Sequence, residues 1–351
     1  MLHRRMAIRR ASVLLALLTT VAVANGAEGE GAVRQLTQLT IDPQSVTVSG
    51  LSSGGAMAVQ FHAAHSSLVR GAGVLAAGPY LCAEGSIQYA LGRCMQDGRD
   101  IPVARLLQLA DDLASNGRID PVAGFVGDRV WLYRGALDPY VNVTVVDALA
   151  EYYRARVGAS NLVRVEREGA SHNFPTSHAD AAACATSASP YVANCGIDGA
   201  RAVLEQMYGP LAAAAETTAL APLVEFDQRP YAAAAGSATL ADRGWLYVPA
   251  ACTEAGAEGC RLHVVFHGCK QGASAVGDAF VRRAGYLEVA DANRIVLLFP
   301  QVKPTLTPLN PLGCWDWWGI EGADYATRDG RQIRAVRAMI GALLGESAVG
   351  S

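Results

Sequence analysis

Short apolar runs alternate along the chain with longer stretches in which apolar residues recur at helical spacing. The short runs are rich in branched and aromatic residues, which is typical of buried strands. They lie at 46–49, 69–77, 129–134, 162–166, 244–248, 262–266 and 295–299.

The stretches between these runs predict helices at 57–66, 101–115, 146–157, 199–208, 277–292 and 330–344. Strands that alternate with helices predict an α/β fold with a mostly parallel sheet and helices on both faces. The Ala-rich segment 211–220 and the loop 227–240 are candidate boundaries, but both are short. The sequence therefore predicts a single domain.

The composition narrows the class of protein. The chain has 351 residues, 51% of them hydrophobic, and a formal net charge of -3. This length supports a large core. The charged residues form no basic patch, so we expect no nucleic-acid partner.

The N-terminal residues have the pattern of a secretory signal peptide. Arginines precede an apolar stretch at 11–24, and Ala22-Val23-Ala24 suits a signal peptidase. We expect a signal peptide at 1–24 and a mature domain at 25–351, secreted or periplasmic. A retained N-terminal anchor is the alternative, but the apolar stretch is short for a membrane span, so we expect no stable membrane association. We also expect a monomer.

Eight cysteines follow the predicted signal peptide, and an even number in this context indicates disulfides. Nearest neighbours suggest one pairing among many that are possible. No spacing typical of a metal site occurs, so we expect no metal and no cofactor. The cysteines are Cys82, Cys94, Cys184, Cys195, Cys252, Cys260, Cys269 and Cys314.

The segment Gly50-Leu51-Ser52-Ser53-Gly54 joins a predicted strand to a predicted helix. This G-x-S-x-G pattern is typical of a hydrolase whose nucleophilic serine lies on a sharp strand-to-helix turn. An ordinary glycine-rich turn is the alternative, because the pattern is short.

The residues after Ser52 favour the hydrolase. Asp138 follows the strand at 129–134, and His172 follows the strand at 162–166. An acid and then a histidine, each at the end of a strand, complete the order that a hydrolase triad requires. His172 would take the proton of Ser52, Asp138 would orient the imidazole, and the Ser53 amide would stabilise the oxyanion.

The second oxyanion donor is expected after a strand that ends in His-Gly, and this pattern occurs far downstream, at His267-Gly268-Cys269. Strand and helix patterns that usually precede the nucleophile thus follow it here. The sequence therefore predicts a circularly permuted α/β-hydrolase fold, with the C-terminal helix leading in space into the strand before Ser52. Chain termini that lie close together make such a rearrangement tolerable.

The segments GLSSGG (50–55), SHNFPT (171–176), HGCKQ (267–271) and NPLGCWDWWG (310–319), with the Asp138 turn, resemble the extracellular poly(3-hydroxybutyrate) depolymerases of the permuted catalytic type. The resemblance implies a serine esterase that cleaves this polyester and its oligomers to short 3-hydroxybutyrate products. It assigns the triad to Ser52, Asp138 and His172, and the oxyanion hole to the amides of Ser53 and Cys269. Cys269 would then form a disulfide near the site rather than act as a thiol nucleophile.

The resemblance also directs attention to four aromatic residues and an asparagine that would line a crevice for the polyester, although each could instead belong to the core. Family members often have Gly where this chain has Ser171, and larger relatives carry a separate polymer-adsorbing domain, which we expect to be absent. The alternatives are an esterase of feruloylated or acetylated polysaccharides or of small esters, a synthetic-polyester hydrolase, and a non-catalytic binding protein. The crevice candidates are Trp315, Trp317, Trp318, Tyr80 and Asn310.

Overall fold

The computed structural model describes residues 34–213, 220–253 and 259–346. These residues belong to one compact unit, Val33–Ser351. The predicted signal peptide lies outside the described residues. None of the described helices is both long and apolar enough to cross a membrane.

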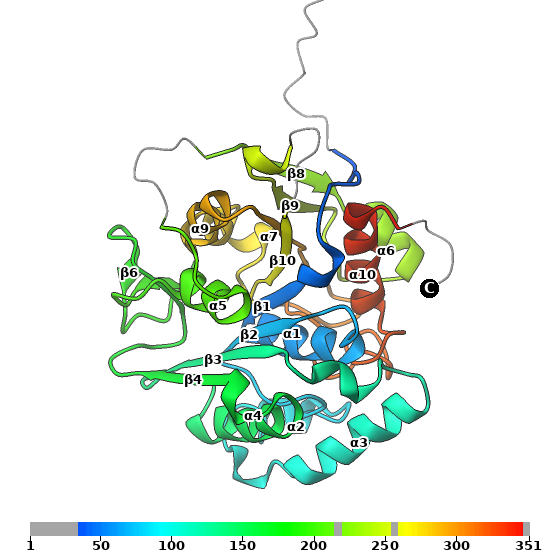
Figure 1. The fold of residues 1–351 in the computed structure, drawn as a ribbon. Coiled ribbons are helices and arrows are strands. Elements are labelled where there is room, and N and C mark those ends of the chain that lie inside the picture. Colours follow the sequence, from blue (N-terminus) through cyan, green and yellow to red (C-terminus); the bar gives the residue numbers. More distant parts are fainter. Residues whose placement is uncertain (1–33, 214–219, 254–258, 347–351) are drawn as a thin grey trace, which may run out of the picture. The chain divides into compact units, whose positions relative to one another are not determined.

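An eight-stranded sheet runs through the unit (Figure 1). Its strands follow the spatial order β4-β3-β2-β1-β10-β11-β9-β8, and β9 runs in the opposite direction to the other seven strands. The strands are β1 (Thr47–Leu51), β2 (Gly71–Leu75), β3 (Arg129–Gly135), β4 (Leu162–Arg167), β8 (Leu223–Asp227), β9 (Arg243–Tyr247), β10 (Arg261–Phe266) and β11 (Ile295–Phe299).

The N-terminal strand lies in the middle of this sheet, where Val48 pairs with Val264 of β10 and Ala72 of β2. When the strands are counted from β8 and continued through β1, their spatial order becomes 1-2-4-3-5-6-7-8. This is the order of an α/β-hydrolase sheet. The segment before β1 also contacts the end of the last helix, since Leu39 N donates to Leu343 O at 2.9 Å. The predicted fold and its permutation are therefore confirmed.

Helices cover both faces of the sheet (Figure 1). α1 and α4 share one face, where His62 stacks on Tyr153, and α5 and α9 pack together on the other. The helices are α1 (Ser53–Ala64), α2 (Ile87–Leu91), α3 (Val103–Ser115), α4 (Val143–Val157), α5 (Gly199–Tyr208), α6 (Arg229–Ala235), α7 (Ala273–Val276), α8 (Ala279–Arg283), α9 (Tyr286–Ala292) and α10 (Arg331–Leu344). Short 3-10 turns lie at Pro43–Ser45, Gly98–Asp100, Val122–Phe125, Ala159–Asn161 and Ala250–Cys252.

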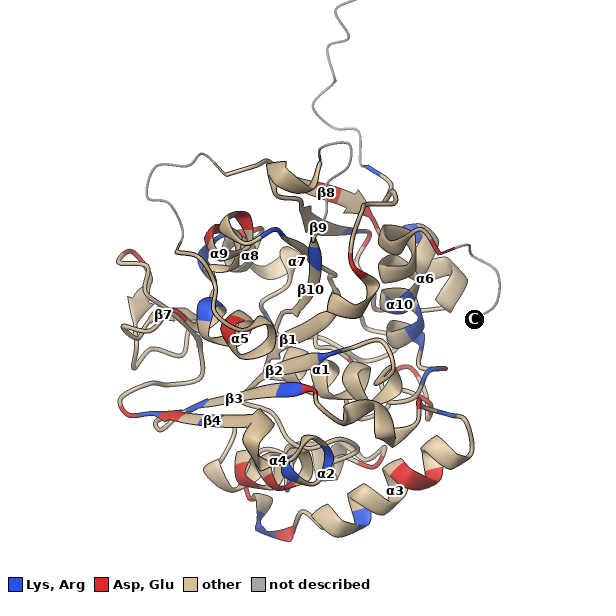
Figure 2. Cartoon of the chain, viewed as in Figure 1, with Lys and Arg blue, Asp and Glu red and all other residues tan. Residues whose placement is uncertain are grey.

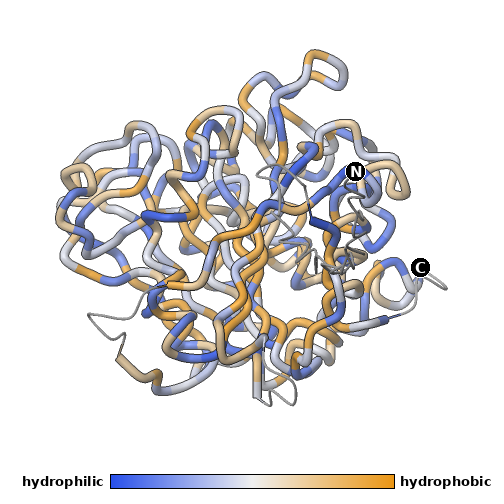
Figure 3. Tube along the Cα trace, turned by 90° about the horizontal axis from the view of Figure 1, so that it is seen from above, coloured by the Kyte–Doolittle hydropathy of each residue, from blue (hydrophilic) through white to orange (hydrophobic). Residues whose placement is uncertain are grey.

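The core lies between the two helix layers. Every residue of β1, β2 and β11 is buried, which explains why these strands read as continuous apolar runs. Hydrophobic positions gather along the central strands in Figure 3, whereas charged residues gather on outer elements such as α3 in Figure 2.

Two sequence predictions need correction. The helix predicted at 277–292 is two short helices, because Gly285 adopts a left-handed φ of 86° between α8 and α9. The loop predicted at 227–240 contains α6, and β8 ends at its first residue. Apolar spacing did not reveal these breaks, because single backbone turns leave the side-chain pattern almost unchanged.

A second, three-stranded sheet has the order β5-β7-β6 and was not predicted. Its strands are Phe174–Thr176, Ala182–Ala183 and Val192–Asn194. All eight cysteines form disulfides between nearest neighbours: Cys82–Cys94, Cys184–Cys195, Cys252–Cys260 and Cys269–Cys314.

Candidate active site

Ser52 occupies a sharp turn between β1 and α1. Its backbone has φ 59° and ψ -123°, a strained conformation for a residue with a side chain. Ser52 N donates to Leu75 O at 2.8 Å, which ties the turn to the neighbouring strand. A strained serine between a central strand and a helix N-terminus is the arrangement of a nucleophile elbow.

The glycines around Ser52 allow α1 to approach the sheet closely. A Cβ atom on Gly54 would lie 2.2 Å from Phe266 O, and one on Gly50 would lie 2.3 Å from Gly54 O. No side chain fits at such distances from backbone atoms. The motif GLSSGG therefore has a steric explanation in this fold.

Asp138 lies in the turn after β3, and both oxygens of its carboxylate have hydrogen-bond partners. Oδ1 accepts from the amides of Tyr140 and Val141, at 2.8 Å and 2.9 Å. Oδ2 lies 2.7 Å from His172 Nδ1. Because a carboxylate accepts, Nδ1 donates, and Nε2 of His172 remains for another partner.

The loop that carries His172 is fixed to its surroundings by backbone bonds. Leu137 N donates to Ala170 O at 2.8 Å, and Ser171 N donates to Cys184 O at 3.0 Å. Asn173 Nδ2 also donates to Cys184 O. The disulfide Cys184–Cys195 thus anchors the segment on which the His172 loop rests.

Tyr140 is a neighbour of the site that the sequence analysis missed. Its ring meets the His172 imidazole edge to face at a centroid distance of 5.1 Å, and its side chain is partly exposed. The feature of the sequence that could have indicated this contact is the position of Tyr140, two residues after Asp138. The two rings are therefore in contact beside the Asp138–His172 pair.

Ser52 is partly exposed, whereas His172 and Asp138 are buried. β1, β3 and β4 are parallel strands of one sheet, so the three residues follow the same edge of it. Among the described residues no hydrogen bond joins Ser52 Oγ to His172. Such bonds often tighten only when a substrate binds.

The backbone amides of Ser53 and Cys269 have no hydrogen-bond acceptor among the described residues. Ser53 begins α1, where the helix dipole favours negative charge. Gly268, which precedes Cys269, lies against the nucleophile: a Cβ atom there would be 3.5 Å from Ser52 Cβ. The two amides are therefore suited to bind an oxyanion.

The five crevice candidates divide into two groups. Trp317 and Trp318 are half-buried, with ring centroids 5.2 Å apart. The other three are corrected to interior residues, because almost none of their surface is exposed. Tyr80 donates to Ala326 O, Asn310 braces Cys314 through two hydrogen bonds, and Trp315 packs on Phe266.

A second histidine–aspartate pair lies inside the protein. His62 Nε2 is 2.9 Å from Asp128 Oδ2, and both residues are buried between α1 and β3. With no exposed surface at His62, this pair serves packing between the elements. Among the described residues no group of three or more His, Cys, Asp or Glu side chains could hold a metal ion.

Several large apolar side chains near this edge of the sheet are exposed. Leu306, Leu309 and Leu312 lie on the loop after β11, and Leu137 and Tyr140 lie on the turn after β3. Leu306 is 86% exposed. Exposed apolar groups that gather into a patch are typical of contact surfaces.

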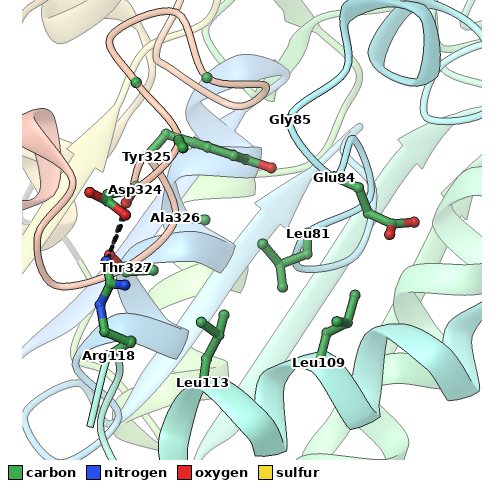
Figure 4. Close-up of a pocket in the computed structure, with 13 residues that line it drawn as sticks. Leu81, Glu84, Gly85, Leu109, Leu113, Arg118, Asp324, Tyr325, Ala326 and Thr327 are labelled. Atoms are coloured by element: carbon green, nitrogen blue, oxygen red, sulfur yellow. Dashed lines mark hydrogen bonds and ion pairs between the residues drawn. The ribbon is translucent and has the colours of Figure 1, made fainter. Parts of the chain in front are cut away.

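A cavity of about 680 Å³ lies between α3, the segment around Leu81 and the segment 319–327 (Figure 4). Leu81, Leu109 and Leu113 line it, and Arg118 at its rim is paired with Asp324 at 2.6 Å. Ser52, Asp138 and His172 do not line this cavity, so it is separate from the candidate catalytic groups.

The chain is similar to known proteins over most of its length, although no family model matches it. It is 44% identical over 307 residues to the poly(3-hydroxybutyrate) depolymerase of Delftia acidovorans, an alignment that covers 87% of this chain and 60% of that protein. It is 36% identical over 320 residues to the polyhydroxybutyrate depolymerase of Talaromyces funiculosus, covering 87% of this chain and 91% of the relative.

Two solved structures share the fold. One is the crystal structure of a PHB depolymerase from Penicillium funiculosum, with a TM-score of 0.83 and 33% identity, covering 89% of this chain and 99% of that one. The other is a serine-to-alanine variant of a PHB depolymerase complexed with an R3HB trimer, with the same TM-score, identity and coverage.

Proposed function

The chain belongs to the polyhydroxybutyrate depolymerase family, and from this premise we propose that it is a serine esterase that hydrolyses poly(3-hydroxybutyrate) and its oligomers to short 3-hydroxybutyrate products. The observation that carries the proposal is the bond between Asp138 and His172 at the sheet edge where Ser52 forms its turn. The resemblance to a structure complexed with an R3HB trimer supports the substrate class.

In the first half of the reaction, Ser52 Oγ attacks the carbonyl carbon of an ester bond while His172 Nε2 takes the hydroxyl proton. Asp138 keeps the imidazole in the tautomer that accepts at Nε2 and stabilises the imidazolium. The amides of Ser53 and Cys269 bind the oxyanion. When the tetrahedral intermediate collapses, His172 gives its proton to the leaving alkoxide, and the acyl group stays on Ser52.

In the second half, water enters as the nucleophile. His172 Nε2 removes a proton from the water as its oxygen attacks the acyl carbon, and the same two amides bind the new oxyanion. The intermediate expels Ser52 Oγ, which recovers its proton from His172. The product leaves with a carboxyl group, and the enzyme returns to its starting state. Each turnover thus consumes one ester bond and one water.

The exposed leucines around the site support a substrate with a large apolar surface. An insoluble polyester presents methyl groups and ester groups but no charge, which suits contact with Leu306, Leu309 and Leu312. Trp317 and Trp318 supply half-buried aromatic surface for a bound segment. We assign these residues to substrate contact as part of the proposal.

The proposal includes the place where the protein works. The four disulfides among the described residues support an oxidising compartment, so we assign the protein to the periplasm or the medium after removal of residues 1–24. We expect the mature domain to act as a monomer, without stable membrane association.

Hydrolysis of a soluble R3HB trimer tests the proposal. The wild-type protein should release dimer and monomer, which chromatography separates. Ser52→Ala should release neither. Ser67→Ala, which changes an exposed serine in the turn after α1, should match the wild type. Cleavage of small aryl esters without cleavage of the trimer would contradict the substrate class. Undiminished cleavage by Ser52→Ala would contradict the mechanism.

A further inference from the structure

The peptide between Gly268 and Cys269 carries the amide that we assign to the oxyanion hole, and side chains hold it on both sides. Gly268 lies beside the nucleophile, where an added Cβ would be 3.2 Å from Leu51 O. Nothing among the described residues accepts from Cys269 N. The direction of this amide therefore depends on what holds the rest of its peptide unit.

The carbonyl end of the unit is held by His267, whose bond to Gly268 O is shorter than the turn bond that Gln271 N donates to the same oxygen at 3.2 Å. His267 Nδ1 lies 2.7 Å from Gly268 O, and His267 Nε2 lies 3.2 Å from Val302 N. A carbonyl only accepts and a backbone amide only donates, so Nδ1 carries the proton and Nε2 is unprotonated. A single neutral tautomer thus satisfies both bonds.

The peptide before Gly268 is held by Gln271. Gly268 N donates to Gln271 Oε1 at 2.7 Å, and Gln271 Nε2 donates to Pro190 O at 2.9 Å. Both backbone polar groups of Gly268 are therefore bonded to side chains, and its carbonyl also accepts from Gln271 N. Because a trans peptide is planar, its N–H points opposite to its C=O. Holding Gly268 O toward His267 turns the Cys269 amide away from His267.

The His267 ring is itself immobilised. It is fully buried, its centroid is 5.7 Å from that of Trp315, and a Cβ on Gly272 would lie 2.8 Å from its Cε1. Burial lowers the pKa of His267 to about 4, so the ring stays neutral at neutral pH. A neutral, wedged ring is a fixed hydrogen-bond donor.

We propose that His267 is a positioning residue that presets the Cys269 amide as an oxyanion donor, with Gln271 fixing the same turn from the other side. The inference rests on the proposed function, because it assigns a reaction step to this amide. An oxyanion hole that is formed before the substrate binds needs no rearrangement during the reaction, which is where such donors gain their effect. His267 acts through the peptide and does not touch the substrate.

Two substitutions of His267 separate this role from simple packing. In His267→Asn the amide nitrogen takes the place of Nδ1 and can still donate to Gly268 O. In His267→Gln the amide lies further out, near the place of Nε2, so the bond to Val302 can form and the donor to Gly268 is lost. The proposal predicts that kcat for the R3HB trimer falls by about 10²-fold in His267→Gln, with KM nearly unchanged. His267→Asn should keep most of kcat.

Binding of butylboronic acid supplies a second readout, because its tetrahedral adduct on Ser52 uses the oxyanion hole. Its affinity should fall with kcat in His267→Gln and persist in His267→Asn. Urea unfolding of both variants measures stability separately. Equal kcat and equal boronate affinity in the two variants would overturn the inference, and so would losses that follow stability alone.

Gln271→Met tests the same turn if His267→Gln fails to fold. It removes the acceptor for Gly268 N without changing His267, and it should lower kcat and boronate affinity while KM stays nearly constant. Wild-type values in this variant would contradict the inference. A wild-type protein that does not cleave the trimer would instead contradict the proposed function, so the two failures are distinguishable.

Discussion

Asp138 Oδ2 lies 2.7 Å from His172 Nδ1, although the two residues are 34 positions apart in the chain. β3 and β4 are adjacent parallel strands, so the turns that follow them meet at one edge of the sheet. A Cβ on Gly135 would lie 2.4 Å from Ala170 O, which shows how closely the two turns approach. This pairing gives the site a fixed base whose free nitrogen is Nε2.

Asp138→Asn should lower kcat by about 10⁴-fold while the protein stays folded, because the amide can donate to Nδ1 and then favours the wrong imidazole tautomer. Steady-state kinetics on the R3HB trimer, together with circular dichroism, measures this. Asp97→Asn is the matched control, since it removes a carboxylate that pairs with Arg99 on the exposed surface. A loss of less than tenfold in Asp138→Asn would exclude Asp138 as the orienting acid.

Replacing both Cys184 and Cys195 by Ser should reduce stability and activity together. The disulfide closes a short loop, and its loss should cost about 2–4 kcal/mol of unfolding free energy. It also anchors the segment that accepts from Ser171 and Asn173, so kcat should fall as well. Urea unfolding and trimer kinetics measure the two effects.

The matched control replaces Cys252 and Cys260, whose disulfide closes a loop of similar length near β10. That variant should lose stability but keep kcat. Unchanged kcat in the Cys184 and Cys195 variant would show that the His172 loop does not depend on its disulfide.

Substitution of Trp315 should have a different effect from substitution of Trp317 or Trp318. Trp317→Ala and Trp318→Ala should raise KM for the trimer, because each removes half-buried surface from the expected crevice. Trp315→Ala should instead lower the unfolding free energy by about 3–5 kcal/mol, because its ring is fully buried against Phe266. If KM is unchanged in both Trp317→Ala and Trp318→Ala, these residues do not bind the substrate.

The free energy of unfolding should rise with pH because of His263, a buried histidine of β10. Burial lowers the pKa of His263 from 6.5 to about 3, and both ring nitrogens bond to hydroxyls, those of Thr47 and Ser49. Between these values the unfolded chain binds a proton that the folded protein does not. The free energy of unfolding therefore increases as pH rises from about 3 to 6.5, by up to about 1.4 kcal/mol per pH unit from this residue.

Urea unfolding of the wild type and of His263→Asn, at several pH values between 4 and 7, isolates that contribution. The variant should lose stability at neutral pH and show a smaller increase with pH. Parallel pH dependences in the two proteins would mean that His263 binds its proton equally in both states.

The sequence predicted the parts of the site that depend on local geometry and chain order. Ser52, Asp138 and His172 each follow a strand. Parallel strands bring such residues to one edge of the sheet, regardless of the conformation of the connecting loops. Trp315, Tyr80 and Asn310 were different, because burial depends on the elements that cover a side chain. Nothing in the Trp-rich segment itself indicates that Trp315 points inward while Trp317 and Trp318 remain half-buried.

The supporting contacts were also beyond the sequence. Tyr140 reaches His172, and Gln271 reaches Pro190, only because separate loops fold against each other. The small sheet that surrounds the Cys184–Cys195 disulfide has strands too short to leave a periodic pattern. Local patterns therefore predict strand ends and the residues on them, whereas tertiary packing determines how those residues are held.

The most direct test of the central claim is the turbidity of an amorphous poly(3-hydroxybutyrate) suspension, followed with the purified mature protein and with its Ser52→Ala variant. The account predicts that the wild type clears the suspension and releases 3-hydroxybutyrate products, and that Ser52→Ala does neither, since loss of the nucleophile can cost about 10⁶-fold in kcat. Clearing by Ser52→Ala at the wild-type rate, or no clearing by a folded wild type that cleaves small esters, would contradict it.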